Sequence, residues 1–163
     1  MIGDGLGTED RVAVEAGKGF MGAALLQGRL DVEVYGPDGE LKDVRRTRNT
    51  VTAAGLTHIA DQLSSSPGEA AMSHMAVGKG TGGTTGLNDE VDRNALTSRT
   101  DAAGVVTYVG DWAAGDATAA LTEAGVFNAA SNGTMLVYAT FAAINKGASD
   151  TLKITWTLTI STS

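Results

Sequence analysis

The 163-residue chain contains no cysteine, which excludes disulfide bonds and cysteine-ligated metal sites. It has two histidines, His58 and His74, which leave little material for a zinc site or a histidine-based catalytic apparatus. Aromatic residues make up 5% of the chain, and it lacks the run of about eighteen apolar residues that a membrane-spanning helix needs. We therefore expect neither a metal nor a membrane as a partner.

Basic residues are also in short supply, 12 against 19 acidic ones, so the formal net charge is −7. Because phosphate repels an acidic surface, we do not expect direct nucleic-acid binding. The amino end has neither the basic nor the apolar region of a secretory signal. What the chain does have is small residues: Gly, Ala and Thr supply 67 of the 163. Hydrophobic residues at 42% suffice for the core of one domain.

Residues 1–28 predict an N-terminal docking arm, followed by a single β-rich domain over 29–163. Seven glycines interrupt the arm, and its apolar stretch 20–26 is too short to span a bilayer. A Gly-rich arm with one apolar segment is typical of an element that docks on a neighbouring subunit or on its own domain. We expect its contacts to come from Phe20, Met21, Leu25 and Leu26.

Alternation of apolar and polar residues predicts several strands, and the pattern is without fault over 151–160. There the residues from Leu152 to Ile160 in one phase would face a core, while threonines face the other side. Further strands are expected at 30–35, 41–48, 72–77, 105–112, 121–128 and 135–143. Turn residues at 36–39 and at Asn132-Gly133 predict hairpins. The segment 87–100 is ambiguous between a loop, an irregular turn and a strand.

One short α-helix is expected at about 52–64. Its apolar stripe, formed by Leu56, Ile59, Ala60 and Leu63, would pack on a sheet. His58 lies off this stripe and could face solvent or cap a sheet edge. Together these elements predict a mainly β fold, an antiparallel β-sandwich or small barrel with one short helix.

The Gly-rich run 78–86 does not match a phosphate-binding loop, because Lys79 is followed by Gly80 and not by Ser or Thr. A structural surface loop is the better interpretation. The acidic group Asp89, Glu90 and Asp92 does not have the spacing of an EF-hand loop and is typical of a solvated segment. No cofactor is expected.

No arrangement of nucleophile, histidine and carboxylate is apparent, and we do not expect an enzyme. Glu123 and Asp111 could in principle pair as the two carboxylates of a glycosidase. Aromatic platforms for a sugar are limited, however, to Trp112 and Trp156. Because Trp156 lies in the apolar phase of its strand, we predict that it belongs to the core.

The one basic cluster of the sequence consists of Lys42, Arg45, Arg46 and Arg48. On a strand, Arg46 and Arg48 share a face with Lys42, and Arg45 points the other way. Two interpretations remain open. The cluster could form an ion-paired hairpin with Asp38, Glu40 and Asp43, or its arginines (Arg45, Arg46 and Arg48) could bind an acidic partner surface.

Several segments, taken in their order along the chain, carry a family resemblance. They are NTVTAAGLTHIA (49–60), MAVGKGT (75–81), LTEAGVFNA (121–129), GTML (133–136) and DTLKITWTLTI (150–160). The chain resembles small structural proteins of tailed bacteriophages over roughly residues 45–162. The arm at 1–28 is not covered.

The resemblance implies a virion component and not an enzyme. It implies first a capsid decoration, or cement, protein that is made in the host cytoplasm. Such a protein binds the major capsid protein on the outer capsid surface and bridges neighbouring capsomers, often as a homotrimer. The alternative is a tail, spike or fibre component that contacts other tail proteins or a host glycan. In the glycan-binding version, Trp112, Tyr108 and the loop 78–86 would be exposed together.

Overall fold

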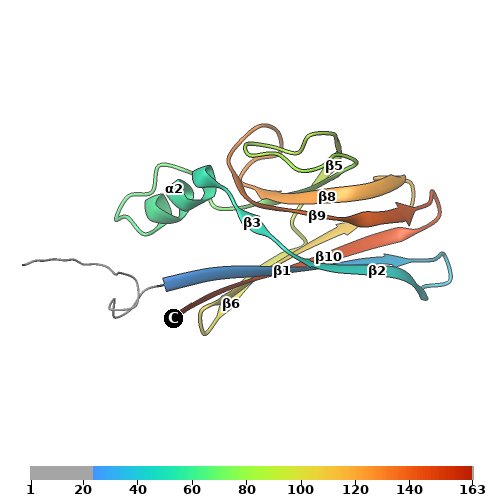
Figure 1. The fold of residues 1–163 in the computed structure, drawn as a ribbon, viewed down its shortest axis with the longest axis horizontal. Helices are drawn as coiled ribbons and strands as arrows, with labels where there is room; N and C mark the ends of the chain where they lie inside the picture. The colour runs from blue at the N-terminus through green and yellow to red at the C-terminus, as the bar shows by residue number, and fades with distance from the viewer. Residues whose placement is uncertain (1–23, 163) are drawn as a thin grey trace, which may run out of the picture.

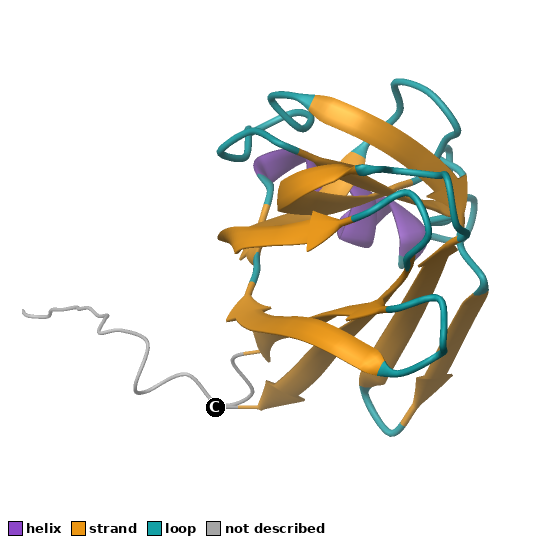
Figure 2. Ribbon diagram, turned by 90° about the vertical axis from the view of Figure 1, so that its right-hand side faces the viewer, coloured by secondary structure: helices purple, strands orange, loops and turns teal. Residues whose placement is uncertain are grey.

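Two antiparallel sheets of five strands pack face to face in the computed structural model, which describes residues 24–162 (Figures 1 and 2). The elements are β1 (Ala24–Tyr35), β2 (Leu41–Arg48), β3 (Thr50–Val51), α2 (Ala53–Gln62), β4 (His74–Gly78), β5 (Glu90–Ala95), β6 (Ser98–Ala102), β7 (Val105–Trp112), β8 (Ala119–Phe127), β9 (Met135–Lys146) and β10 (Thr151–Thr162). The first sheet has the strand order β2-β1-β10-β7-β6, and the second has β3-β9-β8-β4-β5. The predicted mainly β sandwich with one short helix is confirmed.

Strand β10 lies at the centre of the first sheet and supplies much of its inner face. Ile154 and Trp156 are fully buried, and Leu152 and Leu158 are nearly so. The alternate threonines point away from the core, as the period of two requires. The core position predicted for Trp156 is therefore confirmed. The segment 87–100, which the sequence left ambiguous, contains β5 and the start of β6.

The predicted turns contain residues in the left-handed backbone region. Gly39 has a φ of +84° between β1 and β2, and Asn132 and Gly133 have φ values of +55° and +72° between β8 and β9. Glycine and asparagine tolerate this region better than other residues, so both connections follow from their sequence.

The first sheet begins earlier in the chain than the sequence predicts. Strand β1 starts at Ala24, and Ala24 to Gly28 pair with Leu158 to Thr162 at the far end of β10. Leu25 and Leu26 thus lie in the sheet and not in the expected arm, with Leu26 packed against the core. Phe20 and Met21 lie outside the residues that the structure describes.

Helix α2 confirms the predicted position, and Thr52 caps its amino end. The Thr52 hydroxyl oxygen accepts a 2.7 Å hydrogen bond from the backbone N–H of Gly55. Within residues 24–162 the structure contains no helix long and apolar enough to cross a membrane.

The packing face predicted for this helix is right for Ile59, which packs against the core, and wrong for Leu56, Ala60 and Leu63, which are exposed. Leu56 and Leu63 are 57% and 83% exposed, whereas Gly55 and His58 are buried. A Cβ atom at Gly55 would lie 2.2 Å from the carbonyl oxygen of Leu136, so the helix rests on β9 through its glycine. His58 is consequently turned inward, and its Nδ1 lies 2.8 Å from a carboxylate oxygen of Glu69.

Candidate partner-binding face

Three arginines gather on the outer face of the first sheet because of the register of β1 and β2. Arg29 lies directly opposite Arg48, and Asp31 lies opposite Arg46. Residues two apart on a strand point to the same side, so Arg46 and Arg48 share the outer face with Arg29. We call Arg29, Arg46 and Arg48 the arginine face.

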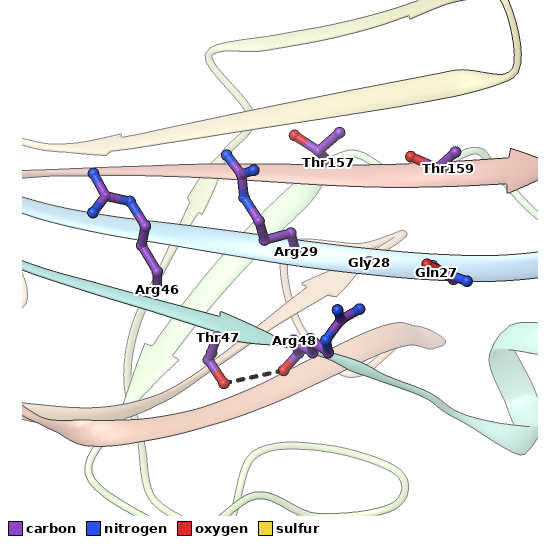
Figure 3. Close-up of a pocket in the computed structure, with 8 residues that line it drawn as sticks. All are labelled: Gln27, Gly28, Arg29, Arg46, Thr47, Arg48, Thr157 and Thr159. Carbon is purple, nitrogen blue, oxygen red and sulfur yellow. Dashed lines mark hydrogen bonds between the residues drawn. The ribbon is translucent and has the colours of Figure 1, made fainter.

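The arginine face borders an open depression of about 460 Å³ that crosses β2, β1 and β10 (Figure 3). Thr157 is paired with Arg29 on the side away from Arg48, and Thr159 follows it along β10. The remaining lining residues are Gln27, Gly28 and Thr47. The lining therefore combines guanidinium groups with hydroxyl and amide groups, all of which can hydrogen-bond to an acidic surface.

One carboxylate, that of Asp31, forms ion pairs with two of the three guanidinium groups. Asp31 lies 2.9 Å from Nη2 of Arg29 and 3.6 Å from Nε of Arg46, and these two arginine side chains are about two-thirds exposed. Arg48 is exposed and has no ion pair within the described part of the chain. Among Arg29, Arg46, Arg48 and Asp31, positive charges therefore exceed negative ones by two, although the whole chain has a net charge of −7. Farther along the same face, Glu33 lies opposite Lys153, which lies opposite Asp111.

Arg45, also predicted to bind a partner, points away from the arginine face, as its strand phase predicts. Its guanidinium group donates hydrogen bonds to the carbonyl oxygens of Ala142, at 3.0 Å, and of Ala143, at 2.7 Å. It also forms an ion pair of 2.6 Å with Asp43. The hydrogen bond that Arg45 donates to Asp43, together with that from the backbone N–H of Val44, holds the pKa of Asp43 below its usual value. Arg45 therefore bridges β2 to β9 in the other sheet.

Lys42, the fourth member of the basic cluster, is ion-paired as well. Its Nζ lies 2.6 Å from Oδ2 of Asp150, a residue that is 2% exposed. The ion-paired hairpin is thus right for Arg45, which pairs with Asp43. Lys42 and Arg46 pair with carboxylates that the prediction did not name, Asp150 and Asp31, and Arg48 has no ion pair among the described residues. Sequence analysis missed Arg29, and the signal that could have found it was the register of the hairpin formed by residues 30–48.

The Gly-rich loop is organised by a carboxylate of the protein itself. Glu123 is fully buried, and its two oxygens accept four backbone N–H groups at distances of 2.7 to 3.2 Å. The donors are Gly80, Gly82, Asn88 and Asp89. An external phosphate would have to displace this carboxylate, so the structural interpretation of the loop is the one that its geometry supports.

The two carboxylates considered as a glycosidase pair lie in different sheets. Glu123 belongs to β8 and is committed to the loop, whereas Asp111 belongs to β7 and lies 3.4 Å from Lys153. Within the described residues, no group of three or more acidic or histidine side chains could hold a metal ion. In the acidic segment, Glu90 pairs with Arg93 at 2.7 Å, and Asp89 lies 3.6 Å from Lys79.

The glycan-binding alternative required Tyr108 and Trp112 to be exposed together, but both side chains are buried. Tyr108 is 7% exposed and Trp112 is 1% exposed. Burial also raises the pKa of the Tyr108 phenol above its usual value. The loop 78–86 joins strands of the second sheet, whereas both aromatic residues belong to β7 of the first.

Comparison of the chain with protein-family models, with curated proteins and with solved structures found no match. The described part of the chain is a β-sandwich that carries three arginines on the outer face of one sheet.

Proposed function

We propose that this chain is a non-catalytic structural protein of a tailed-phage virion, a capsid decoration protein that binds the outer capsid surface. The observation that supports the proposal is the segregation of charge. At one end of an exposed sheet face, an acidic protein gathers three arginines beside a single carboxylate, that of Asp31. Such a face suits an acidic surface on the major capsid protein, while the net charge keeps free copies apart and off the genome.

Repetition would supply the binding strength that one copy lacks. An exposed ion pair contributes at most about 1 kcal/mol, so a single arginine face binds weakly. A homotrimer would present three such faces to neighbouring capsomers at once, and simultaneous engagement raises the overall affinity without any new contact. Copies that bind only the assembled lattice would also stabilise it against opening by mass action.

Of the two predicted arm contacts that the structure describes, Leu25 is the more exposed. Leu25 is 41% exposed at the start of β1 and remains available to a partner, whereas Leu26 is partly used by the core. Deletion of residues 1–23 leaves β1 whole and is the variant to test. We expect that the shortened domain folds and binds particles more weakly than the full chain does.

The experiment that tests the proposal mixes the full chain with purified empty capsids that lack it, followed by co-sedimentation at increasing salt. Wild-type protein should saturate at a fixed number of copies per capsid. Arg48→Glu should weaken binding at least about tenfold, which corresponds to about 1.4 kcal/mol. The substitution breaks no ion pair of the described residues, so a loss of binding reflects the contact and not the fold.

Lys79→Glu is the control, because it makes the same change of charge on a half-exposed residue of the loop that follows β4. Lys79 lies 3.6 Å from Asp89, so circular dichroism checks that this variant is folded. It should bind within about twofold of wild type. Equal binding by wild type and Arg48→Glu would remove the arginine face from the contact. A wild-type chain that ignores capsids would overturn the decoration role and favour the tail, spike or fibre alternative, to be tested with tail proteins and glycans.

A further inference from the structure

Strand β6 forms one edge of the first sheet, and all five of its residues are exposed. It pairs with β7 on one side, from Ser98 opposite Val109 to Ala102 opposite Val105. Its other side has no neighbouring strand in the described chain. An edge of this kind presents a row of backbone donors and acceptors that another strand can complete.

The hairpin turn indicates which backbone groups of β6 face the open edge. Ala103 and Gly104 both have positive φ values, +51° and +81°, and form a two-residue turn between Ala102 and Val105. The residues that flank such a turn are a hydrogen-bonded pair, and the ladder then alternates. Ala102, Thr100 and Ser98 therefore direct their backbone groups toward β7, whereas Arg99 and Asp101 direct theirs outward.

This alternation restricts how a second β6 could add to the edge. In an antiparallel pair the outward-facing residues must lie opposite one another. That condition sets Arg99 against its own copy, Asp101 against its own copy, or Arg99 against Asp101. Like charges directly opposite each other are unfavourable, and opposite charges are favourable. The one register of the three that satisfies charge as well as hydrogen bonding puts Arg99 opposite Asp101, with Thr100 opposite itself.

We propose that β6 is a self-association edge, at which two copies of this chain pair antiparallel about Thr100. The two first sheets then form one continuous sheet, and the two Arg99–Asp101 pairs flank a twofold axis. Asp101 has no ion pair within the described residues. One guanidinium nitrogen of Arg99 donates to the carbonyl oxygen of Met72, which precedes β4 of the second sheet, and this side chain has no ion pair among the described residues.

The pairing is compatible with the arginine face. Arg46 and Arg48 lie on β2, which is the opposite edge of the same sheet, so a second copy on β6 leaves them uncovered. Five paired residues bury far less area than a standard interface, so the contact is weak between free chains. The contact strengthens where copies are concentrated on one surface. On a capsid, each β6 edge would link one trimer to one neighbouring trimer.

A single introduced cysteine tests the register, because the full chain has none. In the proposed pair, Thr100 faces its own copy at a non-hydrogen-bonded position with Cα atoms about 4.5 Å apart, within the span of a disulfide. Under mild oxidation at high protein concentration, Thr100→Cys should form a covalent dimer at least about tenfold faster than Ser98→Cys.

Ser98→Cys is the matched control, since Ser98 is exposed on the same strand and points to the same side as Thr100. In the proposed register its two copies lie about 14 Å apart, too far for a disulfide. Labelling each monomer with a thiol reagent confirms that both cysteines are equally accessible. Equal rates of dimer formation for the two variants, or no dimer from either, would overturn the proposal.

A charge exchange tests the pairing of Arg99 with Asp101. In the Thr100→Cys background, Arg99→Asp or Asp101→Arg alone should slow cross-linking at least about fivefold. The double variant carrying both should return to within about twofold of the parent. Slow cross-linking that the double variant does not restore would contradict the pairing. Because these experiments contain no capsid, their failure is distinguishable from failure of the proposed function.

Discussion

The indole nitrogen of Trp156 donates a hydrogen bond of 2.7 Å to the side-chain oxygen of Asn49, a residue 107 positions earlier in the chain. Trp156 is fully buried at the centre of the first sheet, and Asn49 lies between β2 and β3. The amide of Asn49 occupies the space above Gly28, where a Cβ atom would lie 1.5 Å from the oxygen. These contacts connect β10 and β1 to the segment between β2 and β3, where the chain passes from the first sheet to the second.

Loss of the Trp156 side chain should therefore be costly. We expect Trp156→Ala to lower the free energy of unfolding by about 3–5 kcal/mol, because it leaves a cavity and an unpaired amide. Trp156→Phe, which keeps most of the volume, should cost less. Urea unfolding followed by circular dichroism measures both. A loss under about 1 kcal/mol for the alanine variant would mean that the core assignment is mistaken, and Leu63→Ala, at an 83% exposed position, provides the baseline.

Glu123 should be as important to the second sheet as Trp156 is to the first. Each carboxylate oxygen of Glu123 accepts two backbone N–H groups. Glu123→Gln replaces one of these oxygens by an NH₂ group, which cannot accept a hydrogen bond and would face two backbone N–H donors. We expect a loss of about 3–5 kcal/mol in the free energy of unfolding, with faster amide exchange in residues 80–89. Glu40→Gln, in an exposed turn, should change stability by less than about 0.5 kcal/mol. Equal stability of the two variants would contradict the role assigned to Glu123.

Much of the fold could be predicted from local periodicity, and its main exception is instructive. Strand β7 and the core phase of β10 follow directly from alternation in the sequence. The packing of α2 does not, because an apolar stripe indicates which face is hydrophobic and not which face can approach a neighbour most closely. Gly55 allows a contact with the backbone of Leu136 that no stripe of leucines could make.

The candidate site was only half predictable for a related reason. The strand period separates Arg45 from Arg46 and Arg48 without any structure. Arg29 joins them through the register of β1 and β2, and Glu123 reaches its loop from 34 to 43 positions away. Contacts of that kind depend on which strands become neighbours, and the local pattern carries no such information.

Gly55→Ala tests the close approach of α2 to β9. In an exposed helix this substitution stabilises by about 1 kcal/mol. Here the added methyl group would lie 2.2 Å from a backbone oxygen, so the helix must shift. We expect a net loss of about 1–3 kcal/mol, together with exposure of His58. Thr57→Ala, an exposed substitution in the same helix, should be neutral or slightly stabilising in the same thermal unfolding measurement. A stabilised Gly55→Ala protein would show that the helix does not pack as described.

Asp150 should make the stability of the protein depend on acid pH. Lys42, at 2.6 Å, and the backbone N–H of Gly147, at 2.7 Å, both donate to its carboxylate and hold its pKa below the usual value. Because the pKa is lower in the folded chain than in the unfolded one, the carboxylate stabilises the fold above its ordinary pKa of about 3.9. That contribution is lost as the pH falls through the lowered value.

Asp150→Asn should therefore be less stable than wild type at pH 7, and the difference should shrink between about pH 5 and pH 2. Urea midpoints at a series of pH values measure it. Lys42→Met removes the largest cause of the shift and should flatten the same part of the pH profile while leaving the carboxylate in place. A difference between wild type and Asp150→Asn that stays constant down to pH 2 would mean that the ion pair does not couple to folding. A profile that Lys42→Met leaves unchanged would place the coupling on the backbone N–H of Gly147 and the charge of Lys146.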